Sequence, residues 1–160
     1  MGEIEEFPLA VRLLLRAYPW RRVDPVPWAP LQRPLAACRL ALVSSAAFVA
    51  PGQPPFDDDL RGGDPSFREI PADVDLATLR ETHRSESFDH SGLARDPNLG
   101  FPLERLRELV RAGRIGSLAP RHLSFMGSIL APGRLVKRTA PEAARRLVAD
   151  GVEAALLVPV

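Results

Sequence analysis

Hydrophobic positions along the chain alternate between helical spacing and short continuous runs. Segments 102–113 and 139–151 repeat apolar residues along one helix face, carry proline in the first turn and end at glycine. Segments 38–44 and 154–158 are short and mostly apolar, which is typical of strands buried on both faces of a parallel sheet. This alternation predicts an α/β fold: an open, mainly parallel sheet with flanking helices in a Rossmann-like three-layer arrangement.

Weaker patterns predict the intervening segments. We expect a helix over 5–18, a strand over 66–71 and a short helix over 73–83. The stretch 84–101 is polar and predicts a long loop, whereas 115–129 mixes a possible strand with turns.

Prolines recur between Pro19 and Pro34, which predicts an extended connection in place of a helix. The two tryptophans of the chain lie in this stretch, and they indicate that it crosses the domain and buries aromatic surface. We therefore divide the chain into an N-terminal helix with a proline-rich extension, residues 1–37, and an α/β domain, residues 38–160.

Composition and charge are those of an ordinary globular domain. Hydrophobic residues make up 46% and charged residues 26%, and the net charge of +1 gives no field that would recruit nucleic acid. No apolar run approaches the roughly eighteen residues that predict a membrane span. The N-terminal MGEIEEF lacks the basic and apolar regions of a signal peptide, so we expect a cytoplasmic protein without nucleic-acid or membrane partners.

Cys38 is the single cysteine, so the sequence offers no internal disulfide and no CxxC or Cys/His metal pattern. It opens the apolar stretch CRLALVSSAAFV, which predicts a small buried residue at the start of a strand. A nucleophilic role is the weaker alternative.

Polar residues lie next to each of the three histidines in the sequence. His83 ends the predicted short helix, and His90 follows Asp89 in the polar loop. His122 lies in the stretch PRHLSFMG. A neighbouring carboxylate can orient a histidine and favour its charged form, so these residues are candidates for acid–base chemistry, with structural roles as the alternative.

The same region admits a metal-dependent interpretation. His83, His90 and Asp96 could serve a small metal-dependent hydrolase, with Asn98 as a further polar group. However, the spacing between the two histidines matches no strong zinc-ligand template, so we assign no metal.

Several stretches resemble the selenoprotein B family of glycine/sarcosine/betaine reductases and the related D-proline reductase selenoprotein. The resemblance covers the chain from about Leu40 to its end and is carried by GDPSFREIP (63–71), THRSESFDHSG (82–92), DPNLGFPLERLRELVRAGRIGSLAPRHLSFMG (96–127) and EAARRLVADGVEAALLVPV (142–160). The stretch ALVSSAAFVAPGQPPFD (41–57) is similar to the first strand of the family and the loop after it.

The resemblance implies reductive cleavage of a C–N bond. In the family, the selenolate of a Sec/Cys-x-x-Cys motif attacks the carbon next to an activated amino group and releases the amine. It implies a small amino-acid-like substrate, other subunits of a reductase complex and a thiol or selenol redox partner. A pyruvoyl group on a partner subunit is implied as the group that activates the substrate.

In the family the redox motif follows the strand that ends in LL.PV, which corresponds to the strand before Val160. Because UGA encodes selenocysteine and is read as a stop, we expect selenocysteine to follow Val160, so that this chain lacks the nucleophile and carries no cofactor itself. A non-catalytic binding or assembly subunit with the same fold is the alternative.

The resemblance places six polar residues near that selenol. We expect four of them to support catalysis, namely His83, Asp89, His90 and His122. We expect the other two, Asp96 and Asn98, to bind substrate.

Overall fold

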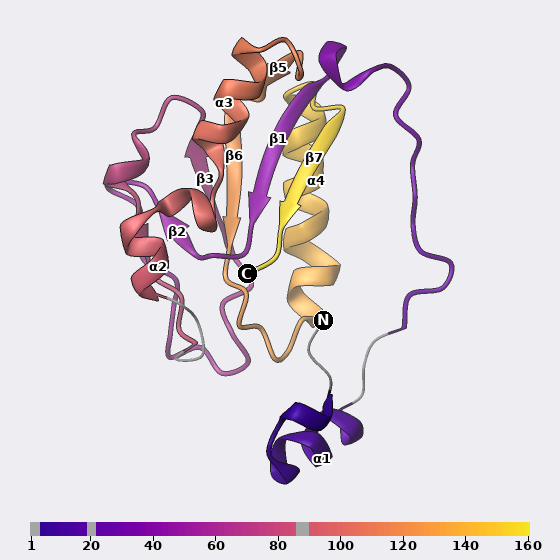
Figure 1. The fold of residues 1–160 in the computed structure, drawn as a ribbon, viewed down its shortest axis with the longest axis vertical. Helices are drawn as coiled ribbons and strands as arrows, with labels where there is room; N and C mark the ends of the chain where they lie inside the picture. The colour runs from indigo at the N-terminus through magenta and orange to yellow at the C-terminus, as the bar shows by residue number, and fades with distance from the viewer. Residues whose placement is uncertain (1–3, 19–21, 86–89) are drawn as a thin grey trace. The chain divides into compact units, whose positions relative to one another are not determined.

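The computed structural model describes residues 4–18, 22–85 and 90–160 (Figure 1). The chain divides into two compact units, Met1–Pro30 and Leu31–Val160, and each is described by itself. The larger unit includes residues 31–37, which the sequence pattern had assigned to the N-terminal extension.

In its described residues, the smaller unit holds one short 3-10 turn, Ile4–Glu6, and one helix, α1, Leu9–Ala17. Pro8 directly precedes α1. Proline suits the start of a helix, because its fixed φ matches the helical conformation and its missing N–H is not needed there. None of the α1 residues is buried, and Leu14 is 65% exposed. The predicted helix is confirmed, and residues 22–34 contain no helix or strand, as their prolines predict. The prediction that this stretch buries aromatic surface is wrong for Trp28, whose side chain is 82% exposed.

The larger unit is built on a mixed, mostly parallel sheet. Its strands are β1 (Arg39–Ser44), β3 (Phe67–Pro71), β5 (Ser117–Leu118), β6 (Arg121–Phe125) and β7 (Ala154–Val158). β1 is central and pairs in parallel with β5, β6 and β7, and β3 extends the sheet antiparallel to β6. A small second sheet pairs β2 (Phe48–Val49) with β4 (Arg80–Glu81).

Helices cover both faces of the sheet (Figure 1). They are α2 (His90–Arg95), α3 (Leu103–Arg111) and α4 (Ala140–Ala149), with short 3-10 turns at Leu35–Ala37, Leu76–Thr78 and Pro97–Leu99 and a π-helical turn at Leu135–Thr139 that runs directly into α4. No helix in the described part of the chain is long and apolar enough to cross a membrane.

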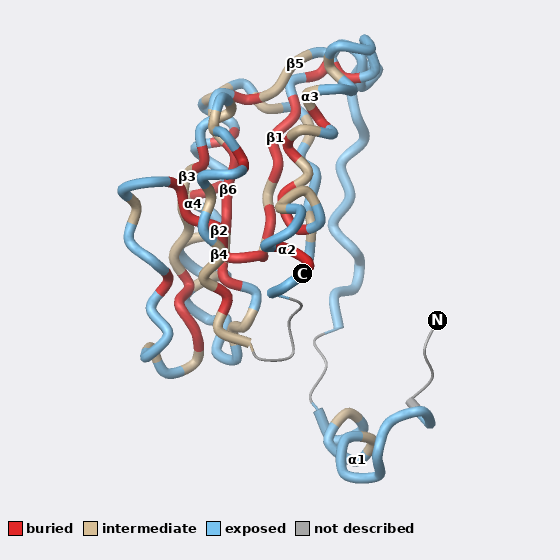
Figure 2. The backbone as a smooth tube through the Cα atoms, turned by 60° about the vertical axis from the view of Figure 1, so that its left-hand side comes forward, coloured by how far each residue is buried: buried red, intermediate tan, exposed pale blue. Residues whose placement is uncertain are grey.

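Alternating residues of β1 reach the two sides of the sheet. Leu40 and Leu42 join the apolar cluster that includes Leu106 of α3, whereas Ala41 joins the cluster that includes Leu147 of α4. This alternation is what the two-residue period of a strand requires, and it confirms the three-layer α/β arrangement. Figure 2 shows the resulting buried backbone concentrated along the central strands.

Cys38 immediately precedes β1 and is 1% exposed, which confirms that it is a small core residue at the start of a strand. Its thiol donates towards the carbonyl oxygens of Arg33 and Pro34. These contacts fix the entry of the chain into the sheet.

Two local predictions were wrong. The segment 73–83 is not a helix: it forms the 3-10 turn Leu76–Thr78, capped by the carboxylate of Asp75, and then β4. The segment 84–101 is not only a loop, because it contains α2 and the 3-10 turn Pro97–Leu99.

The last strand, β7, was expected to be buried on both faces, and this too is wrong. Leu156 is 37% exposed and Leu157 is 68% exposed. Among the described residues β7 pairs with β1 along one side, so it forms the edge of the sheet and its side chains gain no cover there.

Candidate functional site

The carboxyl ends of β1, β6 and β7 meet at one edge of the sheet, because these three strands are parallel. In open α/β sheets this edge is where ligands bind. A cavity of about 570 Å³ opens there. Its lining includes Ser45, Gly127 and Val160 together with the apolar residues Ile129 and Leu135.

Ser45 ties the ends of β1 and β7 together. The backbone N–H of Ser45 donates to the carbonyl of Val158 at 3.1 Å, and the backbone N–H of Val160 donates to Ser45 Oγ at 2.9 Å. The Ser45 hydroxyl in turn lies 3.3 Å from the carbonyl oxygen of Val160. Val160 is therefore held at the rim of the cavity.

The atoms around Gly127, which lies just after β6, leave no room for a side chain at this position. A Cβ built on it would lie 2.8 Å from the carbonyl oxygen of Val160, 2.9 Å from Nε2 of His83 and 3.1 Å from the carbonyl oxygen of Ser45. Four segments that are far apart in the sequence thus converge on one point, and only glycine permits that approach.

The turn after β1 brings His83 to this point. Ala47 has a φ of 55°, in the left-handed region that alanine rarely adopts, and it is fully buried. Its carbonyl accepts the backbone N–H of Thr82 at 3.1 Å and the hydroxyl of Thr82 at 3.0 Å. The strained turn is therefore bonded to the residue that directly precedes His83.

His83 is 8% exposed, and its protonation pattern follows from its contacts. Its Nδ1 accepts the backbone N–H of Ser85 at 3.2 Å, so in the neutral ring the hydrogen is on Nε2, the atom that faces Gly127. Burial lowers the pKa of His83 below its ordinary 6.5, and the carboxylate of Glu81 partly offsets this. His83 therefore has a neutral ring whose Nε2–H lies beside Gly127.

Glu81 links His83 to His90. One carboxylate oxygen accepts the backbone N–H of His83, and the other lies 2.6 Å from Nδ1 of His90. Nε2 of His90 lies 3.0 Å from the carbonyl oxygen of Ser85. Both ring nitrogens of His90 therefore face oxygen atoms, which fix the orientation of the ring. Asp89 lies outside the described residues.

His122 lies in the interior of the sheet and is fully buried. Its Nδ1 accepts the backbone N–H of Leu42 at 3.0 Å, in the place of a backbone acceptor between β1 and β6. Its ring packs edge-on against Phe101, with centroids 6.3 Å apart. Burial lowers the pKa of His122 to about 4, so the ring is neutral at ordinary pH. These contacts give His122 a structural role, and its contribution to catalysis stays a prediction.

Asp96 and Asn98 form a capping unit ahead of α3. Asp96 accepts the backbone N–H and the side-chain amide of Asn98, both at 3.0 Å. Asn98 also bonds Glu104 through the side-chain amide at 3.1 Å and accepts its backbone N–H at 3.2 Å. The two residues thus order the start of α3, and their contact with substrate stays a prediction.

A known protein family matches the sequence that forms this sheet. A sequence profile described as glycine/sarcosine/betaine reductase selenoprotein B matches residues 14–160, nearly the whole chain. The chain belongs to this family. The match includes every segment that meets at the carboxyl edge, and it confirms the resemblance carried by the sequence motifs.

Two curated relatives of this selenoprotein B family chain are reductase subunits. The chain is 33% identical to the D-proline reductase subunit gamma of Acetoanaerobium sticklandii over 136 residues, which are 84% of this chain and 54% of that protein. It is 27% identical to the sarcosine reductase complex component B subunit beta of Peptoclostridium acidaminophilum over 140 residues, 88% of this chain and 32% of that protein. The chain thus spans about half the length of the first and a third of the second. No solved structure matches the chain.

Sequence reasoning missed three members of this candidate site: Ser45, Glu81 and Gly127. Ser45 and Gly127 lie within stretches that carry the family resemblance, but nothing in the pattern marks them individually. Glu81 was placed inside a helix that does not form.

The metal interpretation finds no support among the residues that the structure describes. They contain no group of three His, Cys, Asp or Glu side chains arranged to hold an ion. Glu81 holds His90, and Asp96 caps the turn before α3, so neither His90 nor Asp96 is directed to a shared ion with His83.

Proposed function

We propose that the chain forms the scaffold and part of the active site of a selenoprotein B-type reductase component, which cleaves a C–N bond of a small amino-acid-like substrate. One observation carries the proposal: Val160 is bonded to Ser45 and approaches His83 and Gly127 at the carboxyl edge of the sheet. The two relatives, a D-proline reductase subunit and a sarcosine reductase component, favour the same chemistry.

We further propose that a redox-active selenocysteine or cysteine motif follows Val160. The residues present fit such a group, because Gly127 brings no side chain to this edge and Nε2 of the His83 ring lies next to it. A selenol or low-pKa thiol at this place supplies a soft nucleophile that is ionised near neutral pH.

His83 is the residue of this chain best placed to act beside that group. A neutral imidazole with its hydrogen on Nε2 can donate a hydrogen bond to an anion such as a selenolate or thiolate. Glu81 positions His83 through the backbone N–H and binds His90 on its other oxygen. Asp89, His122, Asp96 and Asn98 remain supporting candidates, and the pyruvoyl group is proposed for a partner subunit.

The experiment is a substrate panel with the complete gene product, purified with its partner subunits through an affinity tag. Glycine, sarcosine, betaine and D-proline are supplied with a dithiol, which provides the two electrons that reductive C–N cleavage consumes. We expect amine or ring-opened product from at least one substrate, and loss of most activity in His83→Gln. An assembled complex that releases no product from any of the four would contradict the proposal and favour a binding subunit.

A further inference from the structure

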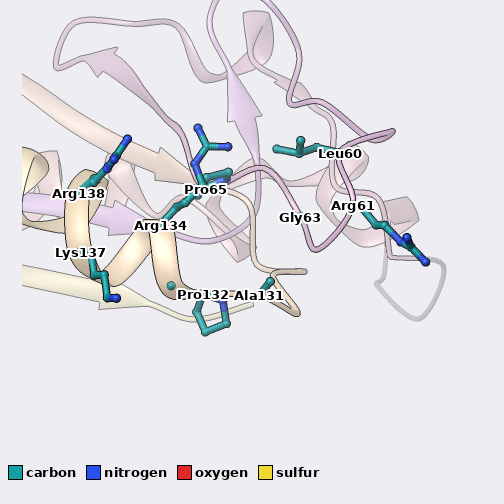
Figure 3. A pocket seen from close by; sticks show the side chains of 10 residues that line it. Leu60, Arg61, Gly63, Pro65, Ala131, Pro132, Arg134, Lys137 and Arg138 are labelled. Atoms are coloured by element: carbon teal, nitrogen blue, oxygen red, sulfur yellow. The ribbon is translucent and has the colours of Figure 1, made fainter.

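We propose that a basic cavity next to the carboxyl edge binds an acidic segment of a partner subunit. The cavity measures about 580 Å³ and lies between the loop 60–65 and the segment 131–138 (Figure 3). Four of its ten lining residues are basic, namely Arg61, Arg134, Lys137 and Arg138, and none is acidic. The inference rests on the proposed function only in taking the partner to be a subunit of the same complex.

The walls of this basic cavity are fixed by backbone contacts. Gly62 and Gly63 both have positive φ, at 91° and 95°, and a Cβ on Gly63 would lie 2.5 Å from the carbonyl oxygen of Ser128. The backbone N–H of Ala131 donates to the carbonyl of Gly62 at 3.0 Å. The hydroxyl of Thr139 donates to the carbonyl of Pro65 at 2.7 Å. The two sides of the cavity are therefore joined rather than merely adjacent.

The positive charge of the cavity is not neutralised within the described parts of the chain. Arg61, Arg134, Lys137 and Arg138 are all exposed, and none forms an ion pair with a described carboxylate. By contrast, Arg121 and Arg146, which lie near the sheet, are both paired with Glu69. Since the whole chain carries 21 basic and 20 acidic residues, this excess of positive charge belongs to the cavity lining itself; the exposed carboxylates of Asp57, Asp58 and Asp59 lie just before it in the loop.

The arrangement of the basic side chains favours an extended ligand. In Figure 3, the side chains of Arg134 and Arg138 extend to one side of the segment 131–138, and that of Lys137 extends to the other side. Arg61 lies on the loop 60–65, at the opposite end of the cavity. Cations that spread around a rim and stay hydrated match several carboxylates along a peptide better than one small anion held at a point. A π-helical turn, Leu135–Thr139, carries Lys137 and Arg138, and such turns recur at functional sites.

The basic cavity lies next to the cavity at the carboxyl edge of the sheet. Pro132 lines both this cavity and the cavity at the carboxyl edge that holds Ser45 and Val160. An acidic segment bound here would therefore hold its subunit beside the strand ends, where a substrate carried by that subunit has to arrive.

The test uses a fluorescent decaglutamate peptide and the complete gene product, with binding followed by fluorescence anisotropy at several salt concentrations. The double variant Arg134→Gln/Lys137→Gln is compared with Arg111→Gln/Arg114→Gln, which removes the same charge from exposed residues at the end of α3. We expect about tenfold weaker binding for the first variant at low salt and a change within about twofold for the second, with affinity that falls as salt rises.

Equal weakening by both variants, or no binding by the unmodified protein, would overturn the proposal. So would a single-stranded oligonucleotide of equal charge that binds at least as tightly, or inorganic phosphate that displaces the peptide at equal charge concentration, since these outcomes identify a nucleic-acid or a small-anion site. Product release is measured separately. A complex without activity that still binds the peptide through Arg134 and Lys137 would contradict the proposed function and leave this docking site in place.

Discussion

The backbone N–H of Val160 donates a 2.9 Å hydrogen bond to the hydroxyl of Ser45, across 115 residues of sequence. This bond joins the carboxyl end of β7 to that of β1 beyond the last paired residues of the two strands, Ser44 and Val158. It fixes where any residue after Val160 would emerge, which is beside His83 and Gly127.

Replacing Ser45 by alanine should loosen this end of β7. The substitution removes the acceptor of the Val160 N–H, so we expect its amide hydrogen to exchange roughly fivefold faster, the equivalent of about 1 kcal/mol. Amide exchange followed by NMR measures this. Ser128→Ala is the control, because that side chain makes no hydrogen bond with described residues. Unchanged exchange at Val160 in Ser45→Ala would contradict the role of the hydroxyl.

Gly127 should be the least replaceable glycine at the carboxyl edge. A Cβ there meets the carbonyl of Val160 and Nε2 of His83 at under 3 Å, so Gly127→Ala should cost about 1–3 kcal/mol of unfolding free energy. Urea unfolding measures the cost. Gly133→Ala is the matched control, since a Cβ at that position meets no atom within 4 Å. If both variants unfold at the same urea concentration, the convergence on Gly127 is not close enough to matter.

The pH dependence of activity should report His83. Burial holds its pKa below 6.5 and Glu81 partly raises it, so the neutral ring persists until the pH falls below its ordinary titration range. If neutral His83 is needed, activity is lost as the pH falls through that lowered pKa. Glu81→Gln removes the negative charge, lowers the pKa further and should move this acid limb to lower pH. A shift to higher pH, or none, in the pH–rate profile would count against the assignment.

His122 should make the fold sensitive to acid. Its pKa is lowered to about 4 in the folded state against 6.5 unfolded, so the unfolded chain binds more protons between these values. The stabilisation is complete above pH 6.5 and is lost as the pH falls towards 4. Urea unfolding at a series of pH values measures this slope.

Two variants of His122 separate its hydrogen bond from its titration. His122→Leu leaves the buried N–H of Leu42 without an acceptor and should cost about 1–3 kcal/mol at pH 7, whereas His122→Asn keeps an acceptor and should cost less. Both variants should flatten the dependence of stability on pH between 4 and 6.5. A slope that survives in both would place the acid sensitivity in other groups.

The sequence predicted those elements whose signal is local. The apolar run before Ser44 and the helical period after Pro102 both produced elements near the expected bounds. The segment 73–83 failed because β4 is stabilised by pairing with Phe48 and Val49, a contact between distant residues that no local period reveals. The burial of β7 was predicted wrongly, because its composition does not show whether a strand pairs with it on one side or on both.

The site was predictable to a smaller degree. His83 and His90 stood out through residue type alone, and the structure shows that Glu81 connects them. His122 also stood out, yet its ring replaces a backbone acceptor for Leu42 in the sheet interior, which depends on the register of β1 against β6. Ser45 and Gly127 matter through backbone proximity, and such proximity exists only in the folded sheet.

The central claim is that a selenol or thiol motif follows Val160 and acts at the carboxyl edge of this sheet. The most direct measurement is the coding DNA beyond the Val160 codon, together with the intact mass of the product made in cells supplied with selenium. The account predicts a UGA codon or a cysteine codon, an in-frame cysteine codon within a few positions and, in the UGA case, a longer protein that contains one selenium atom. A UAA or UAG codon there, or a UGA with no reading frame behind it, would contradict the account.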